Sequence, residues 1–216
     1  MSEAQIQAGS AVLCGNLTVP AGARALVIFA HGSGSSRHSP RNQFVARALN
    51  DAGLGTLLFD LLTEEEEALD LRTGQHRFNI ALLAERLVLA TKWARQQAQT
   101  RHLRTGYFGS STGAAAALVA AAELPGEIDA IVSRGGRPDL AGDALQKVQA
   151  PTLLIVGGHD DIVIELNQRA RQRMRCEVKL EIVPGATHLF EEPGALERVA
   201  RLASDWFARH LGTPES

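Results

Sequence analysis

Cysteine is scarce in this chain of 216 residues, and its two cysteines, Cys14 and Cys176, lie far apart in the sequence. They do not form the closely spaced pairs that hold zinc or iron–sulfur clusters, and no spacing of His, Asp or Glu suggests a metal site. We therefore expect neither a metal nor another cofactor. We also expect both thiols to be reduced and packed, which favours a cytoplasmic location.

A surplus of charge of either sign is also absent. Lys and Arg number 22 and Asp and Glu number 24, so the formal net charge is -2. This balance excludes a general attraction to nucleic acid or to an anionic membrane. Residues 1–5 lack the layout of a signal peptide, and no apolar run is long enough to cross a bilayer. The expected partner is a small-molecule substrate, and the expected state is a monomer or a homodimer.

What the sequence does contain is a series of short apolar runs, typical of strands that are buried on both faces. Strands are predicted at residues 25–30, 56–59, 105–108, 130–132, 152–156 and 179–183, with a weaker edge hairpin at 10–19. Helices are predicted at residues 42–51, 78–97, 114–123, 165–175 and 194–211, and the acidic run 64–67 as a solvated loop or first helical turn. The alternation predicts one α/β domain over residues 1–216, a mostly parallel, doubly wound sheet with helices on both faces.

The segment Gly109-Ser110-Ser111-Thr112-Gly113 lies between a predicted strand and an alanine-rich helix. Glycines two residues before and two after a serine let the chain turn sharply from strand to helix and expose the serine hydroxyl. Ser111 has both glycines, whereas Ser110 does not. The pattern therefore predicts a nucleophile at Ser111, although packing glycines at a tight turn explain the motif alone equally well.

Polar groups follow two further strands, in the order expected when this type of sheet carries a serine triad. Asp160 follows the strand 152–156, and His188 follows the strand 179–183. We expect His188 to accept the proton of Ser111 and Asp160 to orient the imidazole. The backbone N–H groups of Ser33 and Thr112 are the expected oxyanion donors.

These residues resemble an α/β-hydrolase, and especially the dienelactone-hydrolase-like group. The resemblance extends over residues 24–211 and rests on His31-Gly32-Ser33-Gly34, Gly109-Ser110-Ser111-Thr112-Gly113, Gly157-Gly158-His159-Asp160 and Gly185-Ala186-Thr187-His188. It favours Asp160 over the neighbouring Asp161 as the acid. Dienelactone hydrolase itself uses a cysteine nucleophile, so Ser111 points to a general esterase, lactonase or thioesterase.

The resemblance also extends to hydrolase domains fused to phosphoribosyltransferases, although no such partner domain is expected within this sequence. Many relatives insert a lid domain in the connection that here runs from about residue 132, the end of one predicted strand, to about residue 151, just before the next. The short connection predicts instead an open, shallow pocket for small soluble esters.

Three arginines, Arg37, Arg134 and Arg137, fall on loops at the same predicted edge of the sheet. Surface pairing with Asp139 or Asp143 is one explanation. The other is binding of an anionic substrate, because a guanidinium matches the geometry of a carboxylate.

A second class of function is a dinucleotide- or ligand-binding protein without hydrolytic activity. Gly32-Ser33-Gly34 after a strand, with Asp60 after the next, resembles half of a dinucleotide fingerprint. The third glycine is replaced by Arg37, and Pro40 interrupts the expected helix. This interpretation leaves the three triad candidates unexplained. His31 is expected to fix the loop that begins His31-Gly32-Ser33-Gly34 by hydrogen bonding.

Overall fold

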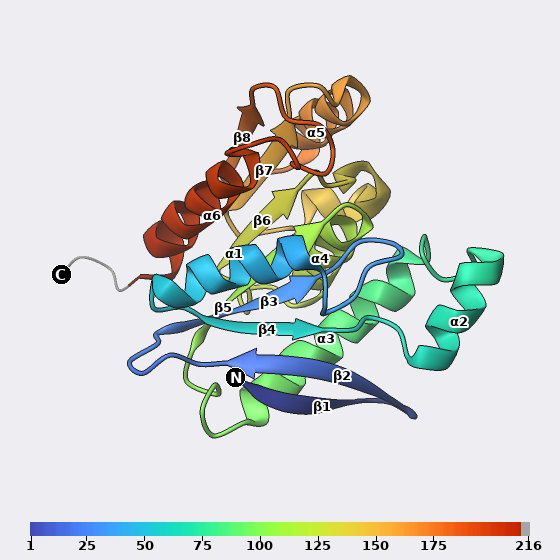
Figure 1. Ribbon diagram of the computed structural model, residues 1–216, viewed down its shortest axis with the longest axis vertical. Coiled ribbons are helices and arrows are strands. Elements are labelled where there is room, and N and C mark those ends of the chain that lie inside the picture. Colours follow the sequence, from blue (N-terminus) through green and yellow to red (C-terminus); the bar gives the residue numbers. More distant parts are fainter. Residues whose placement is uncertain (213–216) are drawn as a thin grey trace.

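The computed structural model describes residues 1–212, and in it one eight-stranded sheet is covered by helices on both faces (Figure 1). The strands are β1 (Ser2–Ala8), β2 (Ala11–Thr18), β3 (Ala25–Ala30), β4 (Gly55–Phe59), β5 (Arg104–Ser110), β6 (Ala130–Arg134), β7 (Thr152–Gly157) and β8 (Val178–Val183). The helices are α1 (Pro40–Asp51), α2 (Glu64–Thr73), α3 (Ile80–Gln96), α4 (Thr112–Glu123), α5 (Asp161–Arg173) and α6 (Ala195–Leu211), with a 3-10 helix, η1 (Pro138–Gln146). The last four residues of the predicted domain, 213–216, lie outside the described residues.

The strand order is β1-β2-β4-β3-β5-β6-β7-β8. The pairs β1–β2 and β2–β4 are antiparallel, and the pairs from β4 through β8 are parallel. The predicted fold class is therefore confirmed. Because β3 to β8 are parallel, their carboxyl ends meet at one edge of the sheet, and the loops that carry the predicted site lie there.

The continuous apolar character of the central strands follows from their burial on both faces. Successive side chains of β3 alternate between two cores. Leu26 and Ile28 pack with α3 and α4, whereas Val27 and Phe29 pack with α1 and α6. Figure 1 shows α1 and α6 together on one face of the sheet and α3 on the other. Both helical layers are thus needed to bury the sheet.

The N-terminal end departs from the prediction. The hairpin is formed by β1 and β2, so residues 11–18 are its inner strand and Ser2–Ala8 form the edge of the sheet. The buried residues of β1 are small or isolated apolar residues at alternate positions, and this pattern gives only a weak sequence signal for a strand. Cys14 is exposed and Cys176 is half-buried, so packing of both thiols was a wrong expectation, although both are free.

The acidic run forms the first turn of α2, one of the two alternatives that the sequence left open. Thr63 caps this helix: its Oγ1 accepts the Glu66 N–H at 3.2 Å, and the Glu66 carboxylate accepts the Thr63 N–H at 2.9 Å. Four carboxylates at a helix N-terminus are favoured by the helix dipole. Within residues 1–212, no helix combines the length and the apolar character needed to span a membrane.

Candidate active site

Ser111 lies at the tight turn between β5 and α4, where its backbone has φ 50° and ψ -120°. A positive φ is unfavourable for a residue with a side chain and persists only where the surroundings enforce it. A Cβ at Gly113 would collide with the carbonyl oxygen of Ala30, and a Cβ at Gly109 would collide with the backbone of Ala114. The two glycines therefore let α4 pack directly on the ends of β3 and β5, which holds Ser111 in its strained conformation.

Asp160 and His188 are joined by a hydrogen bond between Oδ2 and Nδ1 at 2.6 Å. Asp160 follows β7 and His188 lies in the loop after β8, and Asp161 begins α5 instead. A Cβ at Gly157 would lie 2.5 Å from the carbonyl oxygen of Thr187. The absence of a side chain at Gly157 therefore allows the loop after β8 to approach β7 closely enough for the pair to form.

The turn 134–137 links Ser111 to His188. The Ser111 N–H donates to the Arg134 carbonyl at 3.3 Å, and the Arg137 N–H donates to the Ser111 carbonyl at 3.1 Å. Gly135, with φ 52°, packs directly against His188. The structure thus places Ser111 and His188 on two sides of one turn. Within the described residues 1–212, no direct hydrogen bond joins their side chains.

The side chain of Asn167, on α5, fixes this turn from behind. Its amide nitrogen donates to the Gly136 carbonyl at 3.0 Å, and the residue is fully buried. Sequence reasoning missed Asn167, and likewise Asn42, whose buried carbonyl oxygen accepts the Ser110 hydroxyl proton at 3.0 Å. The available signal was a polar residue on the apolar face of an amphipathic helix, because a buried amide needs partners.

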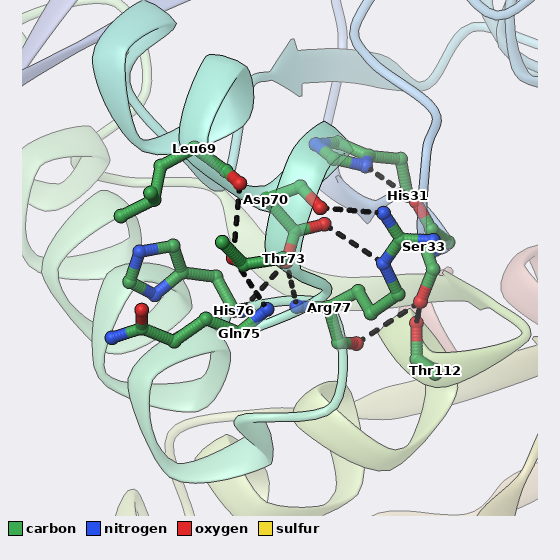
Figure 2. A network of polar contacts seen from close by, with 10 residues as sticks. His31, Ser33, Leu69, Asp70, Thr73, Gln75, His76, Arg77 and Thr112 are labelled. Carbon is green, nitrogen blue, oxygen red and sulfur yellow. Dashed lines mark hydrogen bonds and ion pairs between the residues drawn. The ribbon is translucent and has the colours of Figure 1, made fainter.

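The two predicted oxyanion residues, Ser33 and Thr112, contact each other. The Ser33 N–H donates to Thr112 Oγ1 at 3.1 Å, and the two hydroxyl oxygens lie 3.0 Å apart (Figure 2). The Ser33 hydroxyl also donates to the Arg77 carbonyl at 3.0 Å. In the structure the Ser33 N–H is therefore directed at Thr112, the residue after Ser111, and the Thr112 hydroxyl is its acceptor.

His31 holds the start of this loop, as expected. Its Nε2 accepts the Leu61 N–H at 3.0 Å, so the proton of the neutral ring is on Nδ1, which donates to the Gly32 carbonyl at 2.9 Å. Burial lowers the pKa of His31, because the charged imidazolium would lose its hydration. His31 is thus a neutral structural residue that joins the ends of β3 and β4.

Two of the three predicted substrate arginines have carboxylate partners. Arg37 pairs with Asp60, which also accepts the Arg37 N–H at 2.7 Å. Arg137 forms a two-pronged pair with Asp139, at 2.8 and 2.7 Å. The expected surface pairing of Arg137 with Asp139 is confirmed.

Arg134 differs from the other two arginines because it is buried, with 7% of its surface exposed. No carboxylate pairs with it among the residues that the structure describes; its Nη2 contacts the Asn42 side-chain oxygen at 3.4 Å, and its guanidinium lies 5.9 Å from the centroid of the Phe190 ring. Burial, together with the nearby charge of Arg41, lowers the pKa of Arg134 to about 10. Near neutral pH it is therefore a buried cation whose charge is not compensated.

Among residues 1–212, no three His, Cys, Asp or Glu side chains lie close enough together to hold a metal ion. The hydrogen-bonded pair of Asp160 and His188 can perform proton transfer to and from a hydroxyl, and it lies beside the strained turn of Ser111. Such an arrangement is typical of hydrolases that form a covalent intermediate.

The comparisons with known proteins agree with this chemistry. The sequence matches the dienelactone hydrolase family over residues 13–211. A dienelactone hydrolase from Anabaena variabilis, known from its crystal structure, is 58% identical, with a TM-score of 0.96 over 97% of each chain. A putative phosphoribosyl transferase from Mycobacterium tuberculosis is 59% identical over 98% of this chain and 47% of its own length, so the chain spans about half of that relative. Est1E from Butyrivibrio proteoclasticus shares the fold, with a TM-score of 0.83 at 16% identity over 99% of this chain and 100% of its own. The chain belongs to the dienelactone hydrolase family of α/β hydrolases.

Proposed function

We propose that the protein is a serine hydrolase that cleaves small carboxylic esters through an acyl-enzyme, with Ser111, His188 and Asp160 as its triad. The observation that carries this proposal is the 2.6 Å hydrogen bond between Asp160 and His188, at the sheet edge where Ser111 occupies a strained turn. Membership of a hydrolase family supports it.

Each residue has a defined task in the proposed reaction. Asp160 accepts the Nδ1 proton of His188, so Nε2 is free to take the proton of the Ser111 hydroxyl as its oxygen attacks the carbonyl carbon. The same proton then passes to the leaving alcohol as the bond to it breaks. A water molecule, deprotonated by His188, attacks the acyl-enzyme; the bond between the acyl carbon and Ser111 Oγ breaks, His188 returns the proton to Ser111, and the acid is released.

Negative charge develops on the substrate oxygen in both steps. We propose that the backbone N–H groups of Thr112 and Ser33 stabilise it, each of which is worth about 10²–10³ in rate in comparable sites. For Ser33 this requires the substrate oxygen to replace the Thr112 hydroxyl as the acceptor. The Ser33 N–H already points to the tight turn that carries Ser111, which supports this assignment.

The only helix or strand in the connection between β6 and β7 is the nine-residue η1, so no lid domain is inserted there. This supports small soluble esters as substrates. We further propose that an anionic group on the substrate is attracted to this edge by Arg37, Arg134 and Arg137. Arg134 has the strongest case, because it lacks the carboxylate partner that the other two have.

The proposal is tested by labelling with a fluorophosphonate probe, followed by mass-spectrometric location of the adduct. We expect one adduct at Ser111, none in Ser111→Ala, and full labelling in Ser110→Ala, whose hydroxyl is adjacent but buried. Hydrolysis of p-nitrophenyl acetate should fall about 10⁶-fold in Ser111→Ala and in His188→Ala. An adduct at another residue, or unchanged hydrolysis in Ser111→Ala, contradicts the proposal and favours a binding protein without hydrolytic activity.

A further inference from the structure

Asp70, near the end of α2, is a buried carboxylate surrounded by donors. It accepts the N–H groups of His76 and Arg77 at 2.6 and 2.8 Å, and its second oxygen accepts the Arg77 Nε–H at 3.0 Å. The Arg77 Nη2 also donates to the Asp70 carbonyl at 2.7 Å. Although burial alone would raise it, these donors hold the pKa of Asp70 below its usual range. Asp70 therefore fixes both the main chain and the side chain of Arg77.

The carbonyl of Arg77 passes this constraint to Ser33. A carbonyl oxygen only accepts, so the single proton of the Ser33 hydroxyl is used in its 3.0 Å bond to Arg77. In the 3.0 Å contact between the two hydroxyls, Thr112 must then be the donor, and its oxygen in turn accepts the Ser33 N–H at 3.1 Å. Every proton in this chain of contacts therefore has one possible place. Figure 2 shows the contacts that link Asp70, Arg77, Ser33 and Thr112.

Packing between the Ser33 loop and α2 is incomplete. A small cavity of about 10 Å³, roughly the room of one water molecule, lies between them, with Ser33 and Gly34 on one side and Asp70 and Arg77 on the other. Gly34, with φ 65°, gives the loop backbone additional freedom. Hydrogen bonds beside this cavity therefore help to set the position of the loop on this side.

We propose that Asp70 is a positioning residue for the oxyanion site. It acts through the Arg77 carbonyl and the Ser33 hydroxyl to hold the Ser33 N–H beside the tight turn that carries Ser111. The inference rests on the proposed function. Removing the Asp70 carboxylate should free Arg77 and let the Ser33 loop shift toward the space that the carboxylate vacates, which withdraws an oxyanion donor without changing Ser111, His188 or the rest of the substrate site.

The test compares Asp70→Ala with Asp129→Ala, using p-nitrophenyl acetate. Asp129 is a matched control because it also accepts a backbone N–H, from Thr105 at 3.0 Å, and an arginine, Arg104 at 2.6 Å. It lies at the opposite end of β5, where it cannot touch the loop. We expect Asp70→Ala to lower kcat about 10- to 100-fold with KM changed less than about threefold. Asp129→Ala should lower Tm while kcat stays near the wild-type value.

Ser33→Ala and the double variant Asp70→Ala/Ser33→Ala show whether the effect passes through the loop. If it does, the double variant loses no more activity than the more impaired single variant, because both substitutions break the same chain of contacts. Asp70→Asn, which keeps an oxygen for the N–H groups but not the charge, should lose less than Asp70→Ala and serves if Asp70→Ala does not fold.

The outcomes separate this inference from the proposed function through the rate of fluorophosphonate labelling. Slow but complete labelling of Ser111 in Asp70→Ala supports the inference. Labelling and kcat at wild-type values in both Asp70 variants, or losses that multiply in the double variant, overturn it while leaving the proposed function intact. Absence of a Ser111 adduct in the wild-type protein overturns both.

Discussion

Gly157→Ala is expected to separate the acid from the base without touching either. A Cβ at this position would lie 2.5 Å from the carbonyl oxygens of Ala186 and Thr187, about 1 Å less than the 3.4 Å at which ordinary contact begins. Both contacts are backbone, so relief requires the loop that carries His188 to move away from β7. Movement of about 1 Å would lengthen the 2.6 Å bond between His188 and Asp160 beyond hydrogen-bonding distance.

The magnitude follows from that displacement. A misplacement of about 1 Å costs about 10²-fold in catalysis, and overpacking a buried backbone contact costs about 1–3 kcal/mol of unfolding free energy. The assay is kcat for p-nitrophenyl acetate together with urea unfolding. Gly158→Ala is the control, because its Cβ would lie 3.1 Å from the nearest atom and requires only a small shift. Equal activity in Gly157→Ala and Gly158→Ala would refute the reasoning that the close approach at Gly157 aligns the acid and the base.

Three further predictions concern stability and charge. The pKa of His31 lies below its ordinary value of 6.5, so below that pH the unfolded chain binds a proton that the native protein does not. The contribution of His31 to the unfolding free energy should be constant above about pH 7 and fall by up to about 1.4 kcal/mol per pH unit below 6.5, so urea unfolding at each pH should give a smaller slope in His31→Gln. Arg134→Met should raise Tm, because it removes a buried charge that lacks a carboxylate partner, and should lower kcat/KM for a carboxylate-bearing ester relative to its neutral analogue; an unchanged preference in Arg134→Met contradicts the role of Arg134. Thr63→Ala should cost about 1 kcal/mol by removing the cap of α2, measured by urea unfolding, whereas an unchanged midpoint would show that the cap does not limit stability.

The class of the sheet and the placement of the candidate residues at one edge could be predicted because both depend on strong local patterns. The apolar runs of β3, β4 and β7 are buried at every position, which only a sheet covered on both faces explains. Ser111 follows β5, Asp160 comes after β7 and His188 lies in the loop after β8, so their meeting at one edge required only that the strands be parallel. The edge strand β1 was missed because its apolar positions are few and alternate.

Burial of charge could not be predicted in the same way. Arg134 and Asp70 resemble surface residues in the sequence, because charged side chains are mostly exposed in proteins. One is buried because β6 extends to it, and the other because the segment after α2 folds back over it. The burial of Arg134 involves residues distant in the sequence, such as Asn42 and Phe190, whereas Asp70 is held by residues only six and seven positions later.

The tight fit of Gly113 against the end of β3 has a consequence for how the edge of the sheet deforms. Since α4 touches Ala30 directly, the serine turn and the strand that leads to Ser33 form one stiff block that cannot shear internally. His188 lies instead on the loop after β8, the strand at the edge of the sheet, and this loop meets β7 through the hydrogen bond to Asp160 and the close approach at Gly157. Adaptation to substrates of different width therefore falls to the imidazole side, and amide hydrogen exchange should be faster in the loop that carries His188 than in α4.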